Sequence, residues 1–92
     1  MSARLVRNPV VGETPVDDEI FLVEPDTEEV YWLDRLSAGL WRLLADPVTL
    51  PELQETVRAA FPETDAAKVD ADVATALAEL ERRRLVVARD GA

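Results

Sequence analysis

Residues 28–44, "EEVYWLDRLSAGLWRLL", contain the change of pattern that decides the fold. Residues 30–33 are a short apolar run, whereas the leucines from Leu36 to Leu44 recur at helical spacing. The change falls at Asp34, so the sequence predicts a strand that leads directly into a helix. Because successive side chains of a strand point to opposite faces, this strand carries apolar groups on both. One face is then left to meet solvent or a partner.

The aromatic rings of this stretch divide between the two faces. Val30 and Trp32 share one face of the predicted strand, and Tyr31 and Leu33 share the other. We expect Tyr31 and Leu33 to face the helices and Trp32 to lie on the open face. Trp41, in the following helix, is expected to anchor that helix against the sheet.

Two further strands are predicted before this one. Residues 9–13 are a weak candidate and residues 19–23 a stronger one. Pro25 lies at the second position of a type I turn, after which residues 30–33 return antiparallel to residues 19–23. With the strands in chain order, residues 30–33 form an exposed sheet edge whose unpaired N–H and C=O groups can accept a peptide strand.

Three helices are predicted after the strands. Asp34 caps the first, which runs to about Ala45. Thr49 and Glu52 form a capping box for the second, which ends at Pro62. The third is expected from about residue 66 to 83, after a cap at Thr64 or Asp65. Residues 85–88 form a last short strand or a tail packed on the sheet. The apolar stripe of the third helix is Val69, Val73, Ala76, Leu77 and Leu80.

Gly39 lies inside the first predicted helix. Glycine in a helix interior costs about 1 kcal/mol relative to alanine. Its presence indicates either a close approach of neighbouring backbone or a glycine that the helix simply tolerates. Both interpretations stay open at this point.

The composition fits one domain covering residues 1–92, with an ordered core from about residue 8 to 88. The chain is 48% hydrophobic and 32% charged, which is typical of a globular fold. Its net charge of −9, from 19 acidic and 10 basic side chains, argues against nucleic acid and anionic membranes as partners. A polypeptide partner is easier to accommodate.

Few side chains are available for catalysis or metal binding. The sequence has no His and no Cys, and its only serines are Ser2 and Ser37. These counts exclude a hydrolytic triad and zinc ligands of the usual kind, and no phosphate-binding glycine motif occurs. We therefore expect no enzyme activity, no cofactor and no metal.

The charged clusters are interpreted structurally. Residues 65–72, "DAAKVDAD", lack the glycine of a calcium loop and are read as a solvated helix face with Asp65 near the positive end of the helix dipole. The arginines at 82–84 follow the last helix, where cations are stabilised. The chain carries no apolar run of about 20 residues and no signal-peptide pattern, so we expect a cytoplasmic protein.

The stretch from residue 33 to 44 resembles the PqqD-like proteins, the RiPP recognition elements. That family has Leu-Asn, then Thr or Ser and Gly, then an aromatic residue and Leu-Leu, and the corresponding residues here are Leu33-Asp34, Ser37-Ala38-Gly39 and Trp41 to Leu44. The end of the last helix is also similar, through Leu77, Leu80, Glu81 and Leu85-Val86. The likeness covers about residues 8 to 88. Two positions depart from it: Arg84 stands where the family often has glycine, and the second hairpin lacks its usual glycine.

The resemblance implies an α+β, winged-helix-like fold, with a three-stranded antiparallel sheet followed by three helices. It also implies a non-enzymatic peptide chaperone. Such a protein binds the leader segment of a ribosomally made precursor peptide and delivers it to a modifying enzyme, such as a radical SAM protein, a cyclase or a leader peptidase. A homodimer through the edge strand stays open as well.

The resemblance further implies where the leader binds. It is added as a strand to residues 30–33, in the cleft between that strand and the third helix. The main-chain contacts carried over to this sequence are Glu29, Val30, Tyr31, Trp32 and Leu33. The cleft wall carried over is Val69, Asp72, Val73, Ala76, Leu77 and Leu80. For Val69, Val73, Leu77 and Leu80, core packing beneath the sheet is an equally good interpretation.

Two other functions compete with this one. A winged-helix nucleic-acid-binding protein needs basic residues along its third helix, yet positions 65–81 hold Lys68 against five acidic residues. A phosphopantetheine carrier protein matches in length and acidity but needs an Asp-Ser-Leu site at a helix start. Here Ser37 follows Asp34-Arg35-Leu36 and precedes Ala38.

Overall fold

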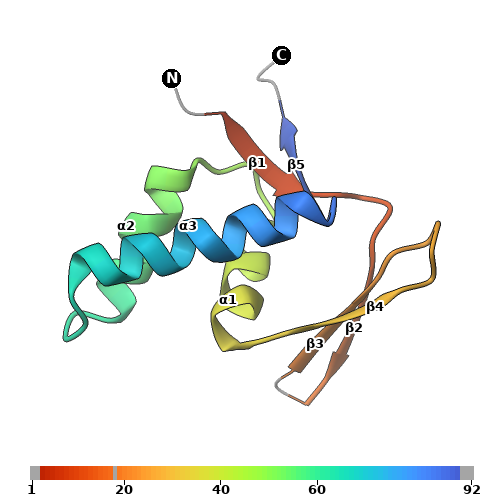
Figure 1. Cartoon of the computed structure of the whole chain (residues 1–92), viewed down its shortest axis with the longest axis horizontal. Helices are drawn as coiled ribbons and strands as arrows, with labels where there is room; N and C mark the ends of the chain where they lie inside the picture. Colours follow the sequence, from red (N-terminus) through yellow and green to blue (C-terminus); the bar gives the residue numbers. More distant parts are fainter. Residues whose placement is uncertain (1–2, 18, 90–92) are drawn as a thin grey trace.

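The computed structural model describes residues 3–17 and 19–89, and in it three consecutive helices follow four strands and precede a fifth (Figure 1). The elements follow in the order β1 (Arg4–Arg7), β2 (Gly12–Val16), β3 (Glu19–Val23), β4 (Val30–Leu33), α1 (Arg35–Leu43), α2 (Leu50–Ala60), α3 (Ala66–Arg82) and β5 (Val86–Arg89). The expected α+β class, three-stranded antiparallel sheet and three consecutive helices are confirmed. Two strands, β1 and β5, are added to them.

The three-stranded sheet has the order β2-β3-β4, with both pairs antiparallel. The first strand of this sheet begins later than predicted: β2 spans Gly12–Val16, whereas the sequence predicts a strand at residues 9–13. The apolar Val10 and Val11 belong to a turn instead. Asn8 Oδ1 accepts from Val10 N–H at 3.2 Å, and the backbone carbonyl of Asn8 accepts from Val11 N–H at 3.1 Å.

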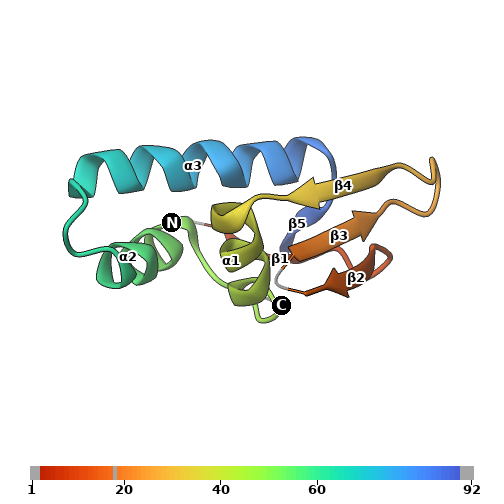
Figure 2. The same ribbon diagram turned by 90° about the horizontal axis from the view of Figure 1, so that it is seen from below.

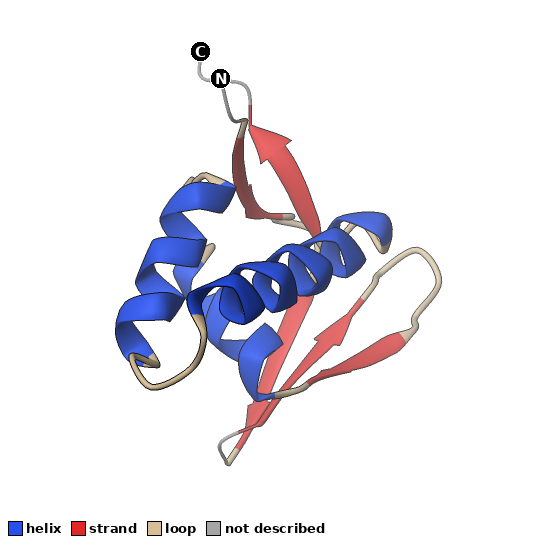
Figure 3. Ribbon diagram, turned by 60° about the vertical axis from the view of Figure 1, so that its left-hand side comes forward, coloured by secondary structure: helices blue, strands red, loops and turns tan. Residues whose placement is uncertain are grey.

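A second sheet consists of β1 and β5, which pair antiparallel from Arg4 opposite Arg89 to Arg7 opposite Val86. The sequence analysis missed β1, which precedes residue 8, and left β5 open between a strand and a tail. Leu5 of β1 also exchanges hydrogen bonds with Val48, at 2.7 and 2.9 Å. This sheet projects away from the helices (Figure 3).

The helix starts agree with the predicted caps. Asp34 Oδ1 accepts from Ser37 N–H at 2.8 Å, and Asp65 caps α3 in the same way. Thr49 and Glu52 form both bonds of the capping box that begins α2. Because each cap satisfies backbone donors that the helix leaves free, these boundaries are local properties of the sequence.

The core lies between α3, the other two helices and the ends of the two sheets (Figure 2). Trp41 is 1% exposed. Its indole N–H donates to Glu13 of β2 at 2.9 Å, and the Arg7 guanidinium lies 4.8 Å from the ring centre. Trp41 therefore anchors α1 against the sheet, as expected. The largest fully buried side chains are Trp41, Leu22, Leu40, Leu44, Leu53, Leu85, Val73 and Val86.

Asp17, Glu28 and Arg84 adopt the left-handed conformation, and the last two lie where the resembled family often has glycine. Glu28 has φ 61° in the turn between β3 and β4, and Arg84 has φ 58° just after α3. Arg84 N–H donates to Glu81 O at 2.9 Å, and Leu85 N–H donates to Leu80 O at 3.0 Å. These two bonds are those of a Schellman motif, so the helix ends in the usual way without its usual glycine.

The charged clusters have structural partners. Asp70 pairs with Arg58 of α2 at 2.9 Å, and Asp72 pairs with Lys68 at 3.3 Å.

No helix within residues 3–17 and 19–89 combines the length and the apolar character needed to cross a membrane. A Cβ added to Gly39 would meet no heavy atom within 4 Å, so the close approach of backbone was the wrong interpretation and the helix tolerates this glycine.

Candidate functional site

The outer edge of β4 has no strand beside it in the described part of the chain. The hairpin from β3 closes with a hydrogen bond from Glu24 N–H to Glu29 O at 2.9 Å. The Glu24 carbonyl accepts from Glu28 N–H at 2.7 Å, so both backbone groups of Glu24 point toward the returning chain, as they do in a hydrogen-bonded pair of the antiparallel ladder. From Val30 to Leu33 the register then continues residue for residue along β3.

Hydrogen-bonded and open pairs alternate along such a ladder. The backbone groups of Tyr31 and Leu33 therefore point inward to β3. The N–H and C=O groups of Val30 and Trp32 point outward to the free edge. At this edge two donors and two acceptors are available to another chain.

Pro15 on the far strand gives an independent check of this alternation. Pro15 lies opposite Ile20 and has no N–H to donate. If Ile20 uses its backbone groups toward Leu33 of β4, its pair with Pro15 is an open one that needs no proline N–H. Pro15 thus lies at a position where the directions assigned to the backbone groups of β4 require no N–H donor.

A cleft of about 400 Å³ lies between β4 and the C-terminal half of α3. Its β4 side is Tyr31, half-buried, and Leu33, 5% exposed. The facing wall of α3 includes Ala76 and Leu80. The complete lining is Val30, Tyr31, Trp32, Leu33, Asp34, Ser37, Ala76, Glu79, Leu80, Arg83 and Leu85.

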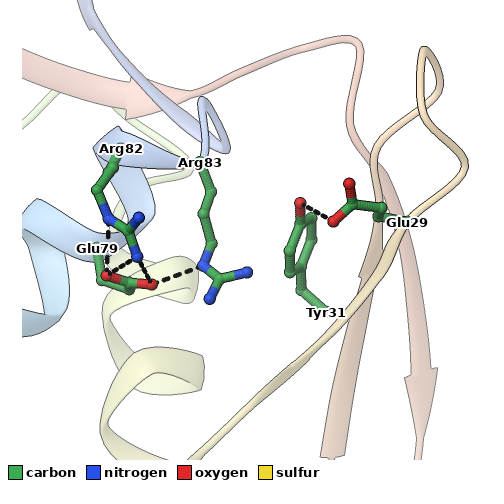
Figure 4. Close-up of polar contacts among 5 residues, drawn as sticks. All are labelled: Glu29, Tyr31, Glu79, Arg82 and Arg83. Atoms are coloured by element: carbon green, nitrogen blue, oxygen red, sulfur yellow. Dashed lines mark hydrogen bonds and ion pairs between the residues drawn. The ribbon is translucent and has the colours of Figure 1, made fainter.

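A chain of polar contacts crosses the cleft at one end (Figure 4). The Tyr31 hydroxyl donates to Glu29 at 2.8 Å, and the Arg83 guanidinium lies 4.8 Å from the centre of the Tyr31 ring. Arg83 Nε donates to Glu79 Oε1 at 2.7 Å. Arg82 holds the same carboxylate at 2.6 and 2.7 Å. The Arg83 side chain thus links α3 to β4.

These contacts shift the titration of the groups involved. Hydrogen bonds from Arg82 and Arg83 lower the pKa of Glu79 below its usual value. The hydrogen bond to Glu29, together with burial, raises the pKa of Tyr31, which Arg83 partly offsets. The carboxylate and the neutral phenol are therefore the forms favoured at neutral pH.

The predicted site residues fall into three groups. Val30, Tyr31, Trp32, Leu33, Ala76 and Leu80 all line the cleft. Glu29 lies outside the lining and contacts it through the Tyr31 hydroxyl. The others are not brought to the cleft: Val69, Val73 and Leu77 are buried in the core, and Asp72 lies among residues of α1, α2 and the start of α3.

The open face of β4 carries two large exposed apolar side chains. Val30 is 61% exposed and Trp32 57% exposed. This agrees with the expectation that Trp32 lies outward while Leu33 faces the helices. Apolar side chains of this size at a sheet edge give an incoming strand a surface to cover.

Sequence reasoning missed Asp34, Ser37, Glu79, Arg83 and Leu85 as lining residues. For two of them a signal was present. Glu79 lies three residues after Ala76, and Arg83 lies four residues after Glu79, so the three residues lie on the same helix face. The sequence analysis interpreted Arg83 through the helix dipole alone and counted Glu79 only among the acidic residues of the helix.

Comparisons with known proteins agree on the family and the fold. The sequence profile of the family described as coenzyme PQQ synthesis protein D (PqqD) matches residues 19–86. Among curated proteins, none matches this sequence significantly.

Three solved structures share the fold. TbiB1 in complex with the TbiA(beta) leader peptide is 22% identical, with a TM-score of 0.79 over 94% of this chain and 99% of that one. Lasso peptide synthetase B1 complexed with the leader peptide is 14% identical, with a TM-score of 0.75 over 90% and 96%. The PqqD truncation of Methylobacterium extorquens PqqCD, a stand-alone RiPP recognition element, is 17% identical, with a TM-score of 0.70 over 91% and 88%.

The profile match spans most of the chain, including β3, β4 and all three helices. The chain therefore belongs to the PqqD family.

Proposed function

We propose that this protein is a non-enzymatic recognition element that binds the leader segment of a ribosomally made precursor peptide. The leader adds as a strand to β4 and lies in the cleft between β4 and α3. One observation carries the proposal: the open backbone groups of Val30 and Trp32 run alongside that cleft. The fold shared with TbiB1 and lasso peptide synthetase B1, each solved with a leader peptide, supports it.

Strand addition divides the leader side chains between two environments. Side chains that point toward α3 enter the cleft between Leu33 and Leu80, where burial stabilises apolar groups. Side chains of the other set lie beside Val30 and Trp32 on the outer face. The backbone bonds supply affinity for any extended peptide, and the cleft selects among sequences.

Of the predicted site residues, we propose direct leader contacts for the six that line the cleft. Glu29 acts through the hydroxyl of Tyr31, which it orients. Val69, Val73 and Leu77 support α3 from the core and do not touch the leader. Asp72, paired with Lys68, has no part in binding.

The charge of the hairpin favours some basic residues in the leader. Asp26, Glu28 and Glu29 lie next to the start of β4 and are all exposed. They repel a strongly acidic segment and attract Lys or Arg at that end. The modifying enzyme that receives the peptide is the second partner of this proposed function.

The test is an NMR titration of the ¹⁵N-labelled protein with a synthetic leader of the precursor encoded beside its gene. We expect amide shifts concentrated on residues 29–34 and 76–85. Shifts confined to other elements contradict the binding site, and no binding to such a leader contradicts the function. A parallel titration with duplex DNA covers the nucleic-acid alternative, for which a salt-dependent shift along α3 is the diagnostic result.

A further inference from the structure

A second hollow, of about 580 Å³, lies between α1 and α2 on a different part of the surface. Both helices pack on α3 rather than closely on each other, which leaves the groove open between them. Leu36, Gly39, Leu40 and Leu43 line it from α1. Val57, Ala60 and Phe61 line it from the α2 side. Two of these apolar side chains are well exposed, Leu43 at 39% and Phe61 at 51%.

Gly39 lies in the middle of the α1 side of this groove. A glycine in a helix interior is unfavourable, and no neighbouring atom in the described fold excludes a larger residue there. Internal packing therefore gives no reason for it. On the groove floor, the missing side chain provides room for a side chain from outside.

Two arginines border the groove along α1. Arg35 and Arg42 are seven residues apart, so they lie on one row about 10.5 Å long beside the apolar row. Neither forms an ion pair with any residue in 3–17 or 19–89. None of the residues lining the groove is acidic, although the chain has 19 acidic and 10 basic side chains. Glu19 lies with both arginines in a neighbouring hollow. The lining of the groove itself is basic, whereas the molecule as a whole is acidic.

From these observations we infer that the α1/α2 groove docks an acidic amphipathic helix of a partner protein. The apolar face of that helix lies on Leu36, Leu43 and Phe61, with one side chain over Gly39. Its carboxylates flank this face and pair with Arg35 and Arg42. Helix-in-groove docking of this kind uses anchors at spacings of three, four and seven residues, which an open groove between two helices can accept.

The groove and the β4/α3 cleft have no lining residue in common. The protein can therefore hold a peptide strand and a partner helix at once. The inference goes beyond the proposed leader binding and does not depend on it. Its test uses protein without any leader peptide.

The probes are two synthetic capped 18-residue helices. Both carry leucines at positions i, i+3, i+4 and i+7, and they differ only in flanking residues that are glutamates in one and lysines in the other. We expect the glutamate helix to shift amides in residues 35–43 and 56–61. We expect the lysine helix to bind at least about tenfold more weakly, because like charges then meet at the groove.

A charge exchange makes the test specific. Arg35→Glu with Arg42→Glu should weaken the glutamate helix by about tenfold or more and strengthen the lysine helix. Gly39→Leu should abolish binding of the glutamate helix while the thermal midpoint of the protein rises, because leucine favours the helix over glycine and meets no neighbouring atom there. Ala78→Leu, at an exposed position of α3 outside the groove, is the matched control and should leave binding unchanged.

Several results overturn the inference. One is equal binding of the two helices, and another is a set of shifts on β4 and α3 instead of the groove. Sedimentation of the protein alone supplies a third: a dimer that dissociates in the Arg35→Glu, Arg42→Glu variant identifies a second copy of this chain as the occupant. Absence of any shift with the glutamate helix also contradicts the proposal.

Discussion

The guanidinium of Arg83 lies over the ring of Tyr31, 4.8 Å from its centre, and joins the end of α3 to the edge strand β4. Arg83 is held from behind by Glu79, and Tyr31 by Glu29. The polar end of the cleft is therefore closed by the stacking of Arg83 on the Tyr31 ring, at the surface of the molecule. Contacts of this kind in exposed positions are weak individually, so the cleft can adjust when a peptide enters.

The Arg83–Tyr31 contact should show as a measurable coupling. In a double-mutant cycle of Arg83→Met and Tyr31→Leu, we expect an interaction free energy of about 0.5–1 kcal/mol. Chemical denaturation of the four proteins gives the value. Arg82→Met is the matched control, because Arg82 binds the same Glu79 but does not stack on Tyr31. Coupling of Arg82 to Tyr31 as strong as that of Arg83 would contradict the assignment.

Proline substitutions should distinguish the two edges of β4. Trp32→Pro removes an outward N–H, so we expect leader affinity to fall by tenfold or more, about 1.4 kcal/mol, while the fold survives. Tyr31→Pro removes an inward ladder bond and should lower the thermal midpoint much further. Calorimetric titration and thermal unfolding of both variants provide the comparison. Trp32→Ala controls for loss of the ring itself. Equal loss of stability in both proline variants would show that the polarity assigned to β4 is wrong.

Glycine should stabilise two of the left-handed positions, Glu28 and Arg84. Arg84→Gly and Glu28→Gly relieve a conformation that costs a side-chain-bearing residue about 1–2 kcal/mol, less the entropy that glycine loses on folding. We expect a net gain of about 0.5–1 kcal/mol at each site, measured by urea unfolding. Arg82→Gly, inside α3, is the control and should destabilise by about 1 kcal/mol. If Arg84→Gly lowers the free energy of unfolding, the Arg84 side chain stabilises the fold by more than its left-handed backbone costs.

Stability should be insensitive to pH near neutrality and should fall in acid. Hydrogen bonds lower the pKa of Glu52, through Thr49, and of Glu79, through Arg82 and Arg83. A carboxyl with a lowered pKa in the folded protein contributes its stability above its unfolded pKa and loses it as the pH falls through the folded one. With no His and no Cys in the chain, we expect a flat thermal midpoint from pH 6 to 8 and a decline below the usual glutamate pKa of 4.5.

Glu52→Gln provides the control for the acid-induced decline. Glutamine can still take part in the capping box but does not titrate, so the variant should lose stability less steeply below pH 4.5. The same slope in the variant and the natural protein would assign the decline to other carboxylates.

Locally encoded features of this fold could be predicted from the sequence. The caps at Asp34, Thr49 and Asp65 depend on residues within one helical turn, and all three are in place. The change of period at Asp34 likewise placed β4 and α1 correctly. In each case the relevant interactions connect residues close in the chain.

Features that depend on distant partners could not be predicted. The strand β1 is four residues long, and its partners are β5, at the other end of the chain, and Val48, which lies more than 40 residues away in sequence. The residues that line the cleft could not be identified from spacing either. The apolar stripe of α3 includes Val73 in the core and Leu80 at the cleft, and both positions have the same helical spacing. The outward direction of the Trp32 backbone became assignable only from the Glu24–Glu29 bond.

The pairing of Arg4 with Arg89 has a practical consequence for protein engineering. The entry and the exit of the described fold lie side by side, at the end of the β1–β5 sheet that projects away from the helices (Figure 3). A domain with adjacent ends can be inserted into a surface loop of a host protein or circularly permuted. A short linker across β1 and β5, with new ends opened in the turn between α2 and α3, would leave β4 and both hollows continuous. Under the proposed leader binding, the protein would serve as a portable peptide-capture module.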